Sequence, residues 1–192
     1  MDRTATKGIG MNWYNEAYEI EGSLYEVWVE HIHDTLHSYK NTDWCDVTLS
    51  LKPYIFQEWG DYERLSHDEA SKFIKELLKR LNIKVYGKAY RRHGKKLLCI
   101  PVIEANKMGR LHIHMFLSIP DYMQYDLDEF CVLVLDTAKE LRWCESDKHA
   151  QNLVRHHKGI QDVDGWISYI LKDIERKPDI LDVTNMHLPA LA

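Results

Sequence analysis

The chain has 192 residues, of which 45% are hydrophobic and 29% are charged, a balance typical of one globular domain that excludes a largely disordered chain. No apolar run reaches the roughly eighteen residues of a membrane span, so we expect no membrane partner. The formal net charge of −5 argues mildly against a nucleic-acid-binding protein, whose binding surface is usually rich in Lys and Arg.

The basic residues are concentrated in one stretch of the chain. No acidic residue lies between Glu76 and Glu104, whereas eight basic residues do: Lys79, Arg80, Lys84, Lys88, Arg91, Arg92, Lys95 and Lys96. This stretch carries +8 and leaves −13 for the rest of the chain. A local basic surface is therefore compatible with the acidic total.

The cysteines indicate a reducing compartment. They are Cys45, Cys99, Cys131 and Cys144. They are far apart, form no Cys-x-x-Cys pair and lie in apolar segments, so we expect buried thiols rather than disulfides or zinc ligands. The first dozen residues also lack the apolar core of a signal peptide.

The first half of the chain predicts a helix, a strand and a second helix. Apolar residues recur at three-to-four spacing over residues 18–39, as in an amphipathic helix. Residues 44–51 alternate between apolar and polar side chains, as in a half-buried strand. A helix over residues 66–81 opens with Ser66 and Glu69, which form a capping box.

The second half predicts four strands and two helices. We expect strands over 83–90, 97–104 and 111–119, a helix over 126–141, a strand over 152–156 and a helix over 162–176. Because hairpins dominate the connections, this order predicts an α+β fold with a single antiparallel sheet and helices packed mainly on one face. We expect a flexible N-terminus over 1–15, one domain over 16–180 and a C-terminal tail over 181–192.

Two histidines and a glutamate form the first candidate site. His112 and His114 lie two residues apart in the predicted strand 111–119, and a strand presents such residues on one face. A hairpin centred near Met108 would set Glu104 opposite His112. Two imidazoles and a carboxylate on an open sheet face can bind a divalent cation as a Lewis acid and leave positions for phosphate or water.

A His-x-His pair alone is weak evidence, because such histidines are more often partly exposed sheet residues. The chain contains a second pair, His31 and His33, within the predicted helix 18–39. Positions i and i+2 of a helix point to different sides, so we reject this pair as the site.

The predicted helix over 162–176 carries a candidate nucleophile. Tyr169, Lys172 and Asp173 share its polar face, because positions i, i+3 and i+4 of a helix lie together. A tyrosine beside a lysine and a metal is suited to attack a phosphodiester and form a phosphotyrosine, since the positive charge favours the phenolate. Taken alone, an exposed tyrosine with an ordinary lysine neighbour is the simpler interpretation, because the chain has eleven tyrosines.

Together these motifs resemble those of the HUH endonucleases, specifically the one-tyrosine replication initiators of rolling-circle plasmids and single-stranded DNA viruses. Their first motif, an apolar strand with a central threonine, is similar to residues 46–51. Their second motif is similar to residues 111–115 and their third to residues 169–173. The resemblance spans about residues 44–176.

The resemblance implies an RRM-like or ferredoxin-like sheet and an enzyme that nicks and rejoins single-stranded DNA at an origin. The metal, Mg or Mn, would be bound by Glu104, His112 and His114. Tyr169 would attack the DNA and keep the 5′ phosphate, while Lys172 would assist electrostatically. A free 3′ hydroxyl would remain to prime synthesis.

The same resemblance implies the partners. Single-stranded or hairpin origin DNA is the expected substrate, and the chain lacks the Gly-x4-Gly-Lys-Ser/Thr loop of a helicase, so a separate helicase and a DNA polymerase are expected. The third motif holds one tyrosine, so termination needs a second subunit or a second reaction, and the oligomeric state stays open. Asp173 is a weaker candidate, as a metal ligand or a partner of Lys172. We expect a cytoplasmic protein of a bacterial or archaeal host, or a nuclear one if the element is eukaryotic.

The basic stretch is predicted to bind DNA beside the metal site, as a hairpin over residues 84–96. Its charges would contact phosphates, and the ring of Tyr86 or Tyr90 would stack on a base. The expected DNA-binding residues are Lys84, Lys88, Arg91, Arg92, Lys95, Lys96 and, from the predicted strand 152–156, Arg155.

Two alternative functions stay open. A one-tyrosine HUH transposase or a mobilisation relaxase would use the same chemistry. Relaxases, however, usually have a third histidine where this chain has Glu104, and those transposases usually follow the tyrosine with Gln rather than Lys. A non-catalytic RRM-like nucleic-acid-binding module would explain the sheet and the basic stretch, but not the metal ligands, Tyr169 and Lys172 together.

Overall fold

The computed structural model describes residues 24–39, 41–58, 60–123, 126–147, 150–157, 161–172, 174, 177 and 180–188. The expected flexible N-terminus over 1–15 lies outside these residues. The elements, in chain order, are α2 (Leu24–Ser38), β1 (Trp44–Ser50), β2 (Tyr54–Phe56), β3 (Tyr62–Arg64), α3 (His67–Tyr86), α4 (Lys88–His93), β4 (Cys99–Ala105), β5 (Leu111–Ser118), η2 (Asp121–Met123), α5 (Leu127–Lys139), β6 (Leu153–His157) and α6 (Gln161–Ile170).

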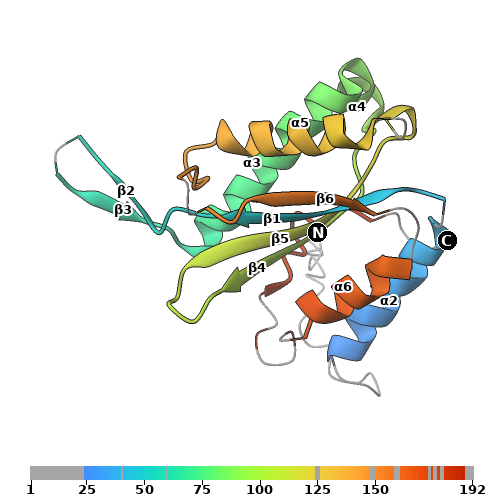
Figure 1. The fold of residues 1–192 in the computed structure, drawn as a ribbon, viewed down its shortest axis with the longest axis horizontal. Helices are drawn as coiled ribbons and strands as arrows, with labels where there is room; N and C mark the ends of the chain where they lie inside the picture. The colour runs from blue at the N-terminus through green and yellow to red at the C-terminus, as the bar shows by residue number, and fades with distance from the viewer. Residues whose placement is uncertain are drawn as a thin grey trace, which may run out of the picture.

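One four-stranded antiparallel sheet forms the centre of the molecule, with the strand order β4-β5-β1-β6, and a small hairpin of β2 and β3 extends from it (Figure 1). The predicted α+β fold with a single main antiparallel sheet is therefore confirmed. Among the described residues, no helix combines the length and the apolarity that crossing a bilayer requires.

Helices α3 and α5 lie together on one face of this sheet (Figure 1). Both begin as their capping sequences predict, because Ser66 Oγ accepts a hydrogen bond from the Glu69 amide at 3.2 Å and Asp126 Oδ1 accepts one from the Glu129 amide at 3.0 Å. Their apolar sides and alternate strand residues form the larger core, which includes Val47, Leu49, Phe73, Leu77, Ile113, Met115, Phe130 and Val134. All four cysteines are buried free thiols, as expected.

Helices α2 and α6 pack against part of the other face (Figure 1). There, Trp44 of β1 and Phe116 of β5 stack with ring centroids 5.0 Å apart. Around them lie Ile32, Leu36, Ile100, Val102, Ile167 and Leu171, all buried. This second cluster ties α6 to the sheet face that also carries the alternate polar residues of β1, β4 and β5.

The predicted strand over 83–90 is wrong. Helix α3 continues to Tyr86, Gly87 ends it with a φ of 50°, and α4 follows. The β-branched residues Ile83 and Val85 alternate with polar ones as in a strand, but Val85 also continues the helical apolar series after Leu81 and packs against the core. Tertiary packing of that series overrides the local strand pattern.

Two further pairings were not predicted. The β2–β3 hairpin follows β1 directly. Near the C-terminus, Cys99 and His187 exchange backbone hydrogen bonds of 2.9 Å, and the Asp182 amide donates to Pro101 O at 3.0 Å. The outer edge of β4 is thus covered by part of the segment that we expected to be a tail.

Candidate active site

The candidate metal cluster is set by strand register. In the pairing of β4 with β5, Glu104 lies opposite His112, as the sequence predicted. The turn between them is closed by Asn106, whose Oδ1 accepts hydrogen bonds from the amides of Met108 at 2.9 Å and Arg110 at 3.0 Å. This turn fixes the register that places the carboxylate beside the imidazoles.

The side chains of this cluster converge on one carboxylate oxygen. Glu104 Oε2 lies 3.3 Å from His112 Nε2 and 3.6 Å from His114 Nε2. On the other side of His114, its Nδ1 lies 3.1 Å from Thr48 Oγ1, because Thr48 of β1 is its partner in the sheet. A ligand imidazole usually has such a partner on its second nitrogen, which fixes the orientation of the ring.

The protonation states suit metal binding. Burial would raise the pKa of Glu104, but the hydrogen bond from His112 and neighbouring positive charges, that of Lys172 among them, hold this pKa below its ordinary value of 4.5. Burial lowers the pKa of His114 from 6.5 to about 4, although Glu104 opposes the shift. At neutral pH the carboxylate is therefore ionised and the imidazole of His114 neutral, as metal ligands must be.

The carboxylate also has an unused ligand position. Glu104 Oε1 is buried and has no hydrogen-bond partner. Such an atom costs roughly 1–3 kcal/mol when it stays unpaired. A divalent cation beside the cluster would satisfy it, and the donor atoms of Glu104, His112 and His114 all lie within 4.8 Å of one another. The residues present therefore fit a metal ion.

Tyr169 and Lys172 lie together on the C-terminal part of α6 and the turn after it. Lys172 Nζ lies 3.7 Å from the centre of the Tyr169 ring, and the Tyr169 side chain is 61% exposed. The charge of Lys172 acts on both Glu104 and His114 by lowering their pKa values, which puts this lysine in the field of the metal cluster. Asp173 lies outside the described residues.

The basic stretch is not beside this cluster. It forms the end of α3, then α4 and the loop into Cys99, so it precedes β4, whereas Glu104 lies near the end of that strand. A seven-residue strand separates the two ends by about 20 Å. The predicted basic hairpin next to the site is therefore wrong, because these residues are helical and at the other end of the sheet (Figure 1).

The predicted DNA-binding residues have different surroundings. Lys84 forms an ion pair with Glu140 at 2.8 Å, and Lys95 lies over the Tyr86 ring at 5.0 Å. The side chains of Lys88, Arg91, Arg92 and Lys96 are exposed. Arg155, on β6, forms an ion pair with the buried Asp46 at 3.0 Å.

A second cluster was missed by the sequence reasoning. His31 packs edge-on against Trp28, whereas His33 faces His37 of the same helix and Asp164 of α6. The pair His31 and His33 is thus correctly rejected, but the four-residue spacing of His33 and His37 was an available signal.

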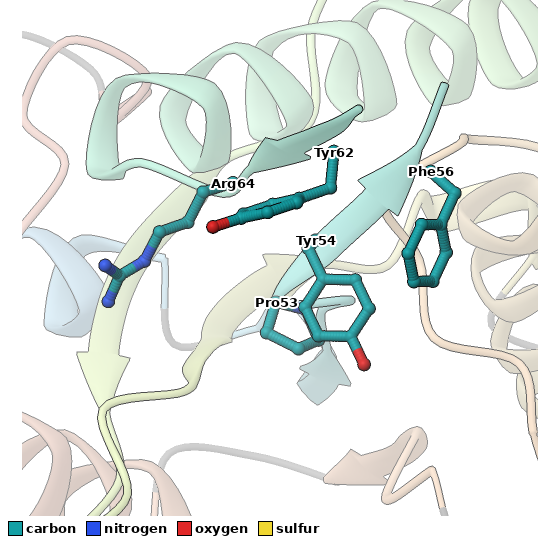
Figure 2. Close-up of a pocket in the computed structure, with 5 residues that line it drawn as sticks. All are labelled: Pro53, Tyr54, Phe56, Tyr62 and Arg64. Atoms are coloured by element: carbon teal, nitrogen blue, oxygen red, sulfur yellow. The ribbon is translucent and has the colours of Figure 1, made fainter. Parts of the chain in front are cut away.

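An exposed aromatic patch was also missed. Tyr54, Phe56 and Tyr62 of the β2–β3 hairpin are 49%, 72% and 67% exposed, and with Pro53 and Arg64 they line a shallow pocket (Figure 2). The hairpin begins just after Ser50, which pairs with His112. It therefore leaves the sheet at the end that carries the metal cluster.

Comparison with known proteins identifies a family. The model of the replication-associated protein ORF2 family matches residues 44–178. No curated protein and no solved structure matches the chain. The matched region runs from β1 past α6 and so includes both the metal cluster and Tyr169.

Proposed function

Because this chain belongs to the replication-associated protein ORF2 family of rolling-circle replication initiators, we propose that it nicks and rejoins single-stranded DNA at an origin. The observation that supports this most directly is the convergence of Glu104, His112 and His114 on the sheet face against which the helix of Tyr169 packs. Alternatives within the same chemistry, a transposase or a relaxase, differ in the DNA that they recognise.

The metal site proposed here consists of Glu104, His112 and His114. A Mg²⁺ or Mn²⁺ ion bound there would act as a Lewis acid on a phosphoryl oxygen and position the scissile phosphate. Thr48 would hold the ring of His114 so that Nε2 points to the ion. The low pKa values of Glu104 and His114 would keep both ligands free of protons at neutral pH.

Tyr169 is the proposed nucleophile. Its phenol oxygen loses a proton and forms a bond to phosphorus, the bond between phosphorus and the 3′ oxygen breaks, and that oxygen takes a proton as the 3′ hydroxyl. The positive charge of Lys172, stacked on the same ring, favours the phenolate. Because the phosphotyrosine retains the energy of the phosphodiester, attack by a 3′ hydroxyl can rejoin the strand.

The DNA contacts proposed for this chain fall into two groups. The exposed basic residues of α4 and its neighbours, namely Lys88, Arg91, Arg92 and Lys96, together with Lys84, Lys95 and Arg155, would attract phosphates. The rings of Tyr54, Phe56 and Tyr62 would stack on unpaired bases near the metal site, because aromatic rings bind single strands without sequence preference.

The decisive experiment follows the covalent product. A hairpin oligonucleotide that carries a candidate origin sequence is labelled at its 3′ end, so that the label stays with the fragment bound through its 5′ phosphate. It is incubated with Mn²⁺ and the wild type, Tyr169→Phe or Tyr122→Phe. Tyr122 is a matched control, since it is 60% exposed and its hydroxyl bonds to Val85 O.

We expect a labelled protein–DNA adduct with the wild type and Tyr122→Phe, and none with Tyr169→Phe. Adduct formation by Tyr169→Phe would refute the mechanism. DNA binding by the wild type without any cleavage would favour a non-catalytic module.

A further inference from the structure

The second cluster of ligand-type side chains lies between α2 and α6, away from the candidate active site. His33 and His37 are one helical turn apart on α2, and their Nε2 atoms are 2.9 Å apart. Asp164 of α6 places Oδ2 3.6 Å from His33 Nε2. The three donor atoms all lie within 4.8 Å of one another.

These separations are close to those of ligands around a single ion. At metal–nitrogen distances of about 2.0–2.1 Å, neighbouring ligand atoms stand about 2.9–3.4 Å apart for octahedral to tetrahedral angles. The separation of His33 from His37 lies at the lower limit of this range, and that of His33 from Asp164 lies slightly above it. Only small side-chain movements are needed to bring all three donors to one ion.

The carboxylate provides an independent sign of a missing partner. Asp164 Oδ1 is buried and has no hydrogen-bond partner, although the side chain as a whole is 44% exposed. Buried carboxylate oxygens normally have a partner. Coordination through the carboxylate would neutralise its charge, and the exposed side of the cluster leaves a path for an ion to enter.

We propose that His33, His37 and Asp164 form a second metal site, which takes a zinc-class ion. Two imidazoles and one carboxylate suit Zn²⁺ better than Mg²⁺, which prefers oxygen ligands, and histidines at i and i+4 of one helix are a common zinc-binding arrangement. The ion cross-links α2 to α6, the helix that carries Tyr169. This site does not depend on the proposed nickase function.

Zinc titration of the full chain, without a histidine tag, tests this site. To isolate it, the double variant His112→Gln/His114→Gln is titrated by calorimetry. We expect one equivalent of Zn²⁺ to bind, with affinity at least tenfold weaker after a further His37→Ala or Asp164→Asn change. Saturating Zn²⁺ should raise the Tm of the parent by roughly 5–10 °C, and that of the His37→Ala variant by much less.

His31→Ala is the matched control, because His31 lies on the same helix and contacts Trp28 instead of the cluster. Its zinc affinity should equal that of the parent. If the double variant does not fold, the stoichiometry of the wild type gives the answer, with two equivalents expected against one for His37→Ala. Equal zinc binding with and without His37 and Asp164 would overturn the proposal and would leave Tyr169-dependent nicking unaffected.

Discussion

The molecule contains two clusters of two histidines and one carboxylate, and they differ in how the chain builds them. The sheet cluster of Glu104, His112 and His114 depends on strand alternation and cross-strand register. The helix cluster of His33, His37 and Asp164 depends on one helical turn and on the packing of α2 against α6. The same donor set therefore arises from two different periodicities.

The clusters also differ in enclosure. The side chains of Glu104 and His114 are 15% and 14% exposed, whereas those of His33 and Asp164 are 42% and 44% exposed. Enclosure shifts pKa values and strengthens electrostatic interactions with a substrate. The difference suggests that chemistry belongs to the sheet cluster and a structural ion to the helix cluster.

The strongest test of this division compares the two His-x-His pairs. His114→Ala removes a proposed ligand and should reduce Mn²⁺-dependent nicking by roughly 10²–10³-fold, because a metal contributes several kcal/mol to the transition state. His31→Ala should leave the nicking rate unchanged, since His31 contacts Trp28 and neither cluster. Rates are measured in single turnover at saturating enzyme. A loss of the same size in both variants would show that the rate responds to fold damage rather than to metal binding.

The contrast between the two pairs shows how far the sequence could lead. Alternation around His112 and His114 and the hairpin turn near Met108 depend on neighbours in the chain, so the sheet cluster could be predicted. Asp164 is far in sequence from His33, so nothing local indicated the second cluster.

Other features failed for related reasons. The segment 83–90 has a strand-like local pattern, yet packing of Val85 against the core keeps it helical. The pairing of Cys99 with His187 joins residues far apart in sequence, and the short strands of the β2–β3 hairpin, three residues each, have too little alternation to be recognised. Only tertiary contacts decide these cases.

The enclosure of the sheet cluster predicts a pH dependence of stability. His114 has a folded pKa of about 4 against 6.5 unfolded, so below pH 6.5 the unfolded chain binds a proton that the folded chain does not. Stability is therefore lost as pH falls from 6.5 towards 4. The lowered pKa of Glu104 acts only below about 4.5, where its stabilisation is lost as the carboxylate protonates. The interval from pH 6.5 to 4.5 thus isolates His114.

Urea unfolding of the metal-free chain measures this effect. Relative to the wild type, His114→Gln should gain roughly 2–3 kcal/mol in the free energy of unfolding as the pH falls from 6.5 to 4.5. Parallel pH profiles for the two proteins would contradict the burial argument for His114.

Lys172 connects the sheet cluster to α6. Lys172→Gln removes the charge stacked on Tyr169, so we expect nicking to slow by about tenfold at pH 7. The deficit should shrink towards pH 10, where an ordinary phenol ionises without help. Lys172→Arg should restore most of the rate, because it restores the charge. A deficit that is constant with pH would indicate that Lys172 only positions the helix.

The smallest expected effects concern the residues next to each cluster. Thr48→Val keeps the shape of the side chain but removes the hydroxyl that holds His114 Nδ1, so Mn²⁺ affinity at the sheet cluster should fall about tenfold, and Thr48→Ser should retain it. In the helix cluster, Asp34 lies 4.0 Å from His33 Nδ1, and its side chain is 64% exposed. Solvent weakens such contacts, so Asp34→Asn should change zinc affinity by less than about twofold. Equal losses for Thr48→Val and Asp34→Asn would mean that enclosure does not set the strength of these supporting contacts, and the two clusters would then differ only in the periodicity that builds them.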